Sequence, residues 1–343
     1  MMGKSIFLHI GLSKTGSSSI QKTLHRSRKL LIQQKIDYVP VGFWGWAHHN
    51  LAFQVREDSR FHNELKPSKK FKESLGTWQT LQKYLEASTA ESFIISSEGF
   101  GSLQFNEIAK IFKHLGGYDT KVVIYVRNQL DMASSNYRQI LNTHDFPLRQ
   151  HFYHSLENEM YKFNKVVENW ASFVGLENIH IRVFENCVND VTNDFLKIIG
   201  ATSLLGKQSA FENVSRDLRT LKLVQKINAK FPKSNPDYSK QRKESLQACL
   251  EYAEAHGWND NRSCVFSRRQ AKKLLSHFES SNHSLESVVG SLPACYYELE
   301  ERYFSAKRLS PIEKIRVLYF WQKITYKRLI SGILSQMNKT LDK

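Results

Sequence analysis

Short apolar runs alternate with amphipathic segments through the N-terminal part of the chain. The apolar runs have the length of strands buried on both faces and cover 5–10, 93–97, 121–126 and 179–184. Between them, apolar residues recur at helical spacing over 17–32, 105–115, 130–141 and 161–173. Strands that alternate with helices predict an α/β fold with a parallel central sheet and helices on both of its faces.

One segment between the first two predicted strands breaks this alternation. Residues 37–77 are rich in aromatic residues and histidine, and they hold a lysine cluster: Lys66, Lys69, Lys70 and Lys72. Long loops inside compact domains are uncommon and usually functional. We therefore expect a functional insertion over the sheet.

The strand pattern stops after Gly200, and from about Asp217 the chain is helical and basic. We predict an α/β core at 1–216 and a mostly helical C-terminal extension, 217–343, packed on that core. In the last segment, 311–341, one helical face carries apolar residues and basic residues stand beside it: Ile330, Ile333, Leu334, Met337 and Leu341, with Lys323, Lys327, Arg328 and Lys339. Such a helix can pack on the core or make peripheral contact with an anionic membrane, and both interpretations stay open.

Charge narrows the choice of partners. The chain has 343 residues and a formal net charge of +16, with 49 Lys and Arg against 33 Asp and Glu. A nucleotide cofactor, an acidic glycan, a membrane surface and nucleic acid would all gain from this charge, while a basic surface without a specific ligand is the alternative. The 41% of hydrophobic residues excludes a disordered or fibrous chain.

The cysteines and the lengths of the apolar runs indicate in which cellular compartment we expect the protein. Four cysteines are scattered without a C-x-x-C pair, so we expect neither a zinc site nor a disulfide framework: Cys187, Cys249, Cys264 and Cys295. The run 6–10 is too short for a signal peptide, and no run approaches the roughly 18 residues of a transmembrane helix. We expect a cytoplasmic protein with reduced thiols, membrane-associated if the C-terminal helix lies on lipid.

A glycine-rich turn follows the first predicted strand, in His9-Ile10-Gly11-Leu12-Ser13-Lys14-Thr15-Gly16-Ser17-Ser18-Ser19. The glycines permit a tight turn, and the helix after it offers N–H groups and a positive dipole end, which predicts a phosphate cradle. Gly11 and Gly16 have the spacing of a Walker A loop, but Ser17 stands in the lysine position and the lysine is Lys14, inside the loop. The loop therefore argues against an ordinary P-loop kinase.

An arginine and a serine follow the strand predicted at 121–126. Arg127 leaves the strand, and Ser135 comes eight residues later on the next helix. A guanidinium fork and a hydroxyl can converge on one phosphate, whereas a triphosphate loop would want an acidic Mg²⁺ ligand at the end of this strand. The alternative is an Arg127 that pairs with a carboxylate at the sheet edge.

These two motifs resemble those of PAPS-dependent sulfotransferases, especially bacterial members and the glycan-modifying branch, where PAPS is 3′-phosphoadenosine 5′-phosphosulfate. The loop at Lys14 is similar to the family pattern K-[ST]-G-[ST]-[ST] between a strand and a helix. The segment from Arg127 to Tyr137 is similar to R-[ND]-P-x-x-R-x-x-S-x-Y, with Gln129 in place of Pro and Met132 in place of the second Arg. The resemblance covers roughly 5–218.

The resemblance implies the P-loop-like sulfotransferase fold and a role for each motif. Lys14 would contact the oxygen that bridges sulfate and phosphate, and the 5′-phosphate would bind at Thr15, Gly16, Ser17, Ser18 and Ser19. Arg127 and Ser135 would hold the 3′-phosphate. The product would be 3′,5′-adenosine bisphosphate, and no metal is required.

A general base must lie near the transferring group, because the acceptor loses a proton. Glu98 directly follows the strand 93–97 and resembles the Glu of the family segment E-K-[ST]-x-x-Y-F, although Gly99 replaces the Lys. A surface Glu that caps the next helix is the alternative. His48 and His49 are rival bases, since imidazole titrates near neutrality. Asn213 and Ser215 resemble a loop that helps to enclose the cofactor.

We therefore expect an enzyme that transfers a sulfuryl group from PAPS to a hydroxyl or amine, with a saccharide or glycolipid as acceptor and no nucleic acid as partner. Basic clusters and aromatic residues suit a saccharide that carries acidic groups. An ATP-dependent phosphotransferase of P-loop type is one alternative. A non-catalytic glycan- or lipid-binding protein on the same fold is the other.

Overall fold

The computed structural model describes residues 3–56, 72–141, 146–206, 217–258, 264–304, 311–312, 314–315 and 317–322. By its internal contacts the chain divides into two compact units. The α/β unit consists of Met1–Asn136, Arg149–Val214 and Phe266–Leu299, and the helical unit consists of Tyr137–Leu148, Ser215–Val265 and Glu300–Lys343. Residues 266–299, which we expected in the C-terminal extension, thus belong to the α/β unit.

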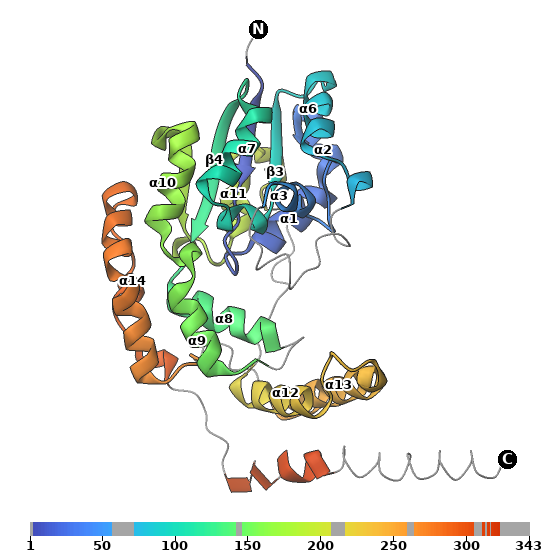
Figure 1. The fold of residues 1–343 in the computed structure, drawn as a ribbon, viewed down its shortest axis with the longest axis vertical. Coiled ribbons are helices and arrows are strands. Elements are labelled where there is room, and N and C mark those ends of the chain that lie inside the picture. The colour runs from blue at the N-terminus through green and yellow to red at the C-terminus, as the bar shows by residue number, and fades with distance from the viewer. Residues whose placement is uncertain are drawn as a thin grey trace, which may run out of the picture. The chain divides into compact units, whose positions relative to one another are not determined.

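A five-stranded parallel sheet forms the centre of the α/β unit (Figure 1). Its strands are β1 (Ser5–His9), β2 (Ile36–Tyr38), β3 (Ser92–Ser96), β4 (Asp119–Val126) and β5 (Ile179–Val183). The spatial order is β2-β3-β1-β4-β5, so the chain places β3 on one side of β1 and β4 on the other. Open α/β sheets bind ligands at the carboxyl ends of the strands beside such a switch point.

Helices occupy the connections between these strands and also follow the last of them. In the α/β unit they are α1 (Ser17–Arg26), α2 (Arg28–Gln33), α3 (His49–Val55), α6 (Trp78–Ala87), α7 (Phe105–Leu115), α9 (Leu148–Glu157), α10 (Phe163–Val174), α11 (Val191–Ile198) and α14 (Arg268–Val289). The helix α8 (Gln129–Leu141) starts in the α/β unit and ends in the helical unit. The helical unit contains α12 (Leu218–Lys230) and α13 (Ser239–Ala255).

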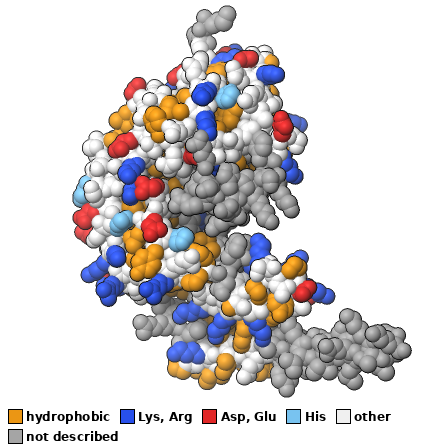
Figure 2. All heavy atoms as spheres, viewed as in Figure 1, with side chains coloured by type: hydrophobic (Ala, Val, Ile, Leu, Met, Phe, Trp, Pro, Cys, Tyr) orange, Lys and Arg blue, Asp and Glu red, His pale blue; other side chains and the backbone are white. Residues whose placement is uncertain are grey.

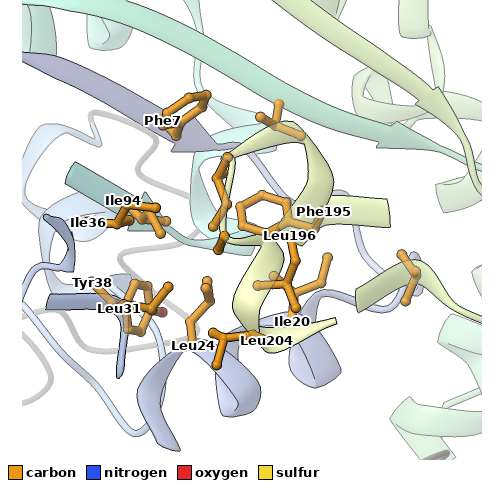
Figure 3. Packing of buried hydrophobic residues seen from close by; sticks show 14 of the residues in the cluster. Phe7, Ile20, Leu24, Leu31, Ile36, Tyr38, Ile94, Phe195, Leu196 and Leu204 are labelled. Atoms are coloured by element: carbon orange, nitrogen blue, oxygen red, sulfur yellow. The ribbon is translucent and has the colours of Figure 1, made fainter. Parts of the chain in front are cut away.

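Apolar side chains from α1, α2 and α11 cover one face of the sheet. Figure 3 shows Ile20, Leu24 and Phe195 beside Phe7 and Ile94 of the strands. On the opposite face α10 contacts β4 and β5, and α7 packs against α10. Burying apolar surface on both sides is what makes these strands read as short continuous apolar runs. The predicted parallel α/β fold is confirmed.

One strand was not predicted. The strand β2 has three residues, and its central Asp37 is buried beside Arg28, whose Nε lies 3.1 Å from Asp37 Oδ1. A charged residue in so short a run hides the apolar pattern that marks a strand. The expected insertion at 37–77 therefore begins inside an edge strand and continues into α3.

The predicted helix over 17–32 is two helices, because the chain turns at Ser27 between α1 and α2. In the helical unit, α12 and α13 pack through a buried cluster that includes Leu221, Val224 and Cys249. Figure 2 shows Lys and Arg side chains spread over the visible face of the molecule.

Several predictions fall outside the described residues. They include the lysines at 66, 69 and 70, the pair Asn213 and Ser215, and the apolar and basic positions that we assigned to a C-terminal helix after 322. Lys72 is described and exposed. Among the described helices, none has the length and apolar content to cross a membrane.

Candidate functional site

The turn between β1 and α1 contains two left-handed backbone conformations. Lys14 has φ 69° and Gly16 has φ 82°. A Cβ on Gly16 would lie 2.7 Å from Val191 Cγ1, so glycine is required for space as well as for conformation. A left-handed conformation at Lys14 is costly for a residue with a side chain and is typical of functional turns.

The hydroxyls of the turn divide into two groups. Thr15 and Ser17 are buried, and the Thr15 hydroxyl donates to the carbonyl of Leu12 at 2.7 Å. Ser18 is exposed and Ser19 is half-buried. Gly16 at the cap position has no side chain to accept the first N–H groups of α1, of which the Ser19 N–H donates to the Gly16 carbonyl at 3.0 Å. The turn thus presents main-chain N–H groups at the start of α1 together with the two outer serines, on a loop that Thr15 holds in shape.

Arg127 connects the end of β4 with this turn. Its Nη1 donates to the main-chain carbonyl of Lys14 at 2.7 Å, and its guanidinium lies 5.0 Å from the ring centre of Phe184. The two motifs, which are 113 residues apart in the chain, thus meet at one edge of the sheet. The Arg127 guanidinium and the glycine turn thus lie side by side.

Arg127 also lies near a carboxylate, as the alternative interpretation expected, but the ion pair is weak. Arg127 Nη2 lies 3.8 Å from Asp131 Oδ2, one helical turn further along, and both side chains are partly exposed. Such a pair contributes little to stability. Ser135 follows Asp131 by one more turn of α8, so it lies on the same face of the helix, and it is buried.

Glu98 stands beside the turn, in the helical turn Glu98–Ser102 that follows β3. Its Cγ would lie 3.4 Å from a Cβ placed on Gly11. Burial raises the pKa of Glu98 above its usual value, and the charge of Lys14 opposes the rise. The cap of this turn is Ser97, whose hydroxyl accepts the N–H of Gly99 at 3.0 Å. Glu98 is thus not needed as the cap and lies close to Lys14.

His49 lies on the other side of Ser97. A hydrogen bond of 2.8 Å joins His49 Nδ1 to Ser97 Oγ. Burial, followed by the charge of Arg56, lowers the pKa of His49, so the imidazole is neutral at neutral pH. A neutral imidazole can accept a proton, which keeps His49 as a second candidate base.

His48 is fixed by the backbone instead. Its Nε2 donates to the carbonyl of Val39 at 2.8 Å, and its Nδ1 accepts the N–H of Ser96 at 2.9 Å. The ring is fully buried, and burial lowers its pKa to about 4. His48 therefore joins the chain after β2 to the end of β3, and its nitrogens are not available to a substrate.

Sequence reasoning missed two buried polar groups at this edge. His9, at the end of β1, is bonded through Nδ1 to Ser96 Oγ at 2.7 Å, and burial lowers its pKa to about 3. Glu185, just after β5, accepts the N–H of Asn128 at 2.9 Å, and burial raises its pKa. A histidine within an apolar run was a visible signal for His9, while nothing in the sequence pairs Glu185 with Asn128.

Tyr137 does not belong to this edge. Its hydroxyl donates to the carbonyl of Phe146 at 3.0 Å and accepts from Gln225 Nε2 at 2.6 Å, and the ring is part of the buried cluster of the helical unit. By these contacts Tyr137 contributes to packing.

A hollow of about 300 Å³ opens near α3 and is lined by Phe43, Trp44, Gly45, Lys72 and Leu75. The ring of Phe53 connects it with His49: its centre lies 6.3 Å from that of Trp44 and 6.3 Å from that of His49. The hollow thus combines aromatic surface with the Lys72 cation, and the Phe53 ring lies between Trp44 and His49.

No arrangement of three or more His, Cys, Asp or Glu side chains suited to a metal ion occurs within the described ranges. The cysteines at 187, 249, 264 and 295 are not joined in disulfides.

Comparison with known proteins gives remote likenesses. No protein-family model matches the chain, and no curated protein matches it. A sulfotransferase from Alicyclobacillus acidocaldarius is similar in structure with 13% identity, coverage of 85% of this chain and 98% of the other, and a TM-score of 0.46. A retinol dehydratase in complex with androsterone and inactive cofactor PAP has 12% identity, coverage of 81% and 80%, and a TM-score of 0.35.

Proposed function

We propose that this chain is a sulfotransferase that uses PAPS. The observation that carries the proposal is the contact of the Arg127 guanidinium with the anion-binding turn at Lys14. A nucleotide with phosphate on both its 5′ and 3′ positions presents two anionic groups to one site. A main-chain cradle and a strand-edge guanidinium match such a pair, and Ser135 lies on the helical face that Arg127 approaches.

The transfer forms a bond between the acceptor oxygen or nitrogen and sulfur, and it breaks the bond from sulfur to the bridging oxygen of the 5′-phosphate. Negative charge develops on that oxygen, where Lys14 and the start of α1 would stabilise it. The acceptor proton passes to the base. The second product is 3′,5′-adenosine bisphosphate.

Glu98 is our first choice of base because its side chain lies near Lys14 and its pKa is raised. A carboxylate with a raised pKa accepts a proton more readily, and a neighbouring Lys14 keeps enough of it ionised. His49 is the second choice, because it is hydrogen-bonded to Ser97, the residue that precedes Glu98.

For the acceptor we propose a saccharide, free or lipid-linked, that carries acidic groups. The hollow beside α3 supports this class, because Phe43 and Trp44 offer apolar faces to a sugar ring and Lys72 offers a charge to an acidic substituent.

The structure gives no support to the phosphotransferase alternative. Ser17, in the Walker lysine position, is buried within the loop, and Arg127 stands where a Mg²⁺ ligand would be wanted.

The decisive experiment is transfer of labelled sulfate from PAPS onto panels of acidic glycans, glycolipids and phenols. Transfer from PAPS, with none of labelled phosphate from ATP–Mg²⁺, supports the proposal. Activity with ATP–Mg²⁺ alone would refute it.

A further inference from the structure

The turn after β4, which carries Arg127, is held by residues far along the chain within the same α/β unit. Asn128 Nδ2 donates to the main-chain carbonyl of Cys295. The Tyr296 hydroxyl donates to Glu185 Oε2 at 3.0 Å, and the other oxygen of Glu185 accepts the Asn128 N–H at 2.9 Å. The residue next to Arg127 is therefore fixed twice, through the Asn128 side chain and through the Asn128 N–H.

Gln129 continues this network. Its Nε2 donates to Asn282 Oδ1 at 2.6 Å, and Asn282 Nδ2 donates back to Gln129 Oε1 at 3.3 Å. Asn282 also donates to the carbonyl of Tyr296 at 3.2 Å. Both amide side chains are fully buried. The helix α14 and the turn Ala294–Tyr296 are thus joined to the residues immediately after Arg127.

A buried amide pair is a poor way to gain stability, because two apolar side chains of the same size would avoid the cost of desolvation. Its advantage is geometry, since each hydrogen bond fixes a direction and a fully bonded network has one arrangement. The group that needs a fixed direction here is Arg127, because a guanidinium fork binds phosphate only when its two N–H groups are aligned with the oxygens.

We infer that Gln129, Asn282 and Tyr296 are positioning residues that aim Arg127 at the 3′-phosphate of the cofactor. This inference rests on the proposed use of PAPS. It makes the segment Phe266–Leu299 a support of the cofactor site that acts through Arg127.

A purely structural role would predict a different result. Loss of packing lowers the stability of the protein and weakens the binding of every nucleotide to the same extent. If Arg127 loses its orientation instead, only the contact with the 3′-phosphate becomes weaker. The readout is therefore the ratio of two dissociation constants, for adenosine 5′-phosphate and for 3′,5′-adenosine bisphosphate, measured by calorimetry on the full chain.

The matched pair of variants is Asn282→Ala and Ser281→Ala. Ser281 is the preceding residue of α14, and its hydroxyl donates to Asn164 Oδ1 on α10 at 2.6 Å, so its loss weakens the same helix without touching the turn. We expect Asn282→Ala to lower the ratio about tenfold, the loss typical of one misaligned hydrogen bond to a charged group, with unchanged affinity for adenosine 5′-phosphate. Ser281→Ala should keep the wild-type ratio.

Tyr296→Phe provides a second variant, because it removes one hydroxyl and keeps the carbonyl that Asn282 needs. It should lower the ratio in the same direction, and it decides the question if Asn282→Ala does not fold. A folded Asn282→Ala or Tyr296→Phe with the wild-type ratio would overturn the inference and leave the proposed function intact. A wild-type chain that does not prefer the bisphosphate would refute the proposed function itself.

Discussion

At the scale of single residues, the site places charges of opposite sign close together on a partly buried edge. Lys14 and Glu98 are near enough for the cation to oppose the rise in the pKa of Glu98. The same proximity suits two different tasks, stabilisation of the leaving oxygen by Lys14 and removal of the acceptor proton by Glu98.

Lys14→Ala should lower kcat by about 100- to 1000-fold, as loss of one group that stabilises developing charge does in other enzymes. The affinity for 3′,5′-adenosine bisphosphate should change much less, because main-chain N–H groups remain. Rates and nucleotide titrations check both statements. The control is Lys29→Ala, which removes an exposed lysine from α2. Equal effects of the two variants on kcat would contradict the role of Lys14.

Glu98→Gln should lower kcat by about 100- to 10000-fold, the range for loss of a general base. In the wild type, activity should fall on the acidic side as Glu98 takes up a proton, above the usual range of carboxyl groups because its pKa is raised. The pH–rate profile of the wild type and of Glu98→Gln checks this. A profile for Glu98→Gln that keeps both the wild-type rate and its acidic limb would assign the base to another residue.

Glu98→Gln should also be more stable than the wild type at neutral pH. Because the folded protein holds the Glu98 proton more tightly than the unfolded chain, stability is lost as pH rises from the unfolded pKa through the folded one. The amide removes that loss. Thermal unfolding at pH 5 and pH 8 measures it, and the expected difference between variant and wild type is larger at the higher pH. A stability gain of the variant over the wild type that is smaller at pH 8 than at pH 5 would contradict this prediction.

At the scale of elements, the apolar pattern predicted those strands and helices whose formation depends on residues close together in the sequence. The four longer strands and α7 lie within two residues of their expected bounds. The pattern could not predict β2, whose Asp37 is satisfied by Arg28 and by Tyr84 of α6. It also could not separate His48 from His49, because only the fold decides which ring meets the backbone.

His48→Ala and His49→Ala should therefore have different effects. His48→Ala leaves the carbonyl of Val39 and the N–H of Ser96 without their buried partner, so it should lower the free energy of unfolding by about 1–3 kcal/mol. His49→Ala should cost less stability and act on the rate. Denaturant unfolding and steady-state kinetics on the two variants test this, and a more stable His48→Ala than His49→Ala would contradict it.

Gly16→Ala tests the turn as an element. The new Cβ would meet Val191 and would force a side chain into φ 82°, which costs about 1–2 kcal/mol from the conformation alone. We expect lower stability and weaker binding of the bisphosphate. Gly117→Ala is the control, because a Cβ there meets nothing within 4 Å. Binding by Gly16→Ala as tight as that of the control would show that the turn does not hold the nucleotide.

At the scale of the whole molecule, contacts distant in sequence complete the site. Asn128 and Cys295 are 167 residues apart, and Gln129 and Asn282 are 153 residues apart. Neither periodicity nor a local motif carries information on such pairs, so sequence reasoning ended the core near residue 216. The positions of the glycine turn and of Arg127 could be predicted because each depends on a local pattern, a turn and a strand end, while the network behind Arg127 could not.

The net charge of +16 also acts at this scale. Because Lys and Arg side chains are spread over the visible surface (Figure 2), attraction of an anionic acceptor should be long-ranged and screened by salt. We expect kcat/KM for an acidic glycan to fall as salt rises from about 50 to 500 mM, with a smaller effect on a neutral acceptor of the same size. Equal salt dependence for the two acceptors would contradict this.

The central claim is that the turn at Lys14 and the guanidinium of Arg127 bind the two phosphate groups of one nucleotide. Calorimetric titration of the folded wild-type chain with 3′,5′-adenosine bisphosphate tests it most directly, beside Arg127→Lys, which keeps the charge and loses the fork. We predict saturable one-to-one binding by the wild type and a loss of preference for the 3′-phosphate in the variant. No binding by the wild type, or equal preference in both, would contradict the claim.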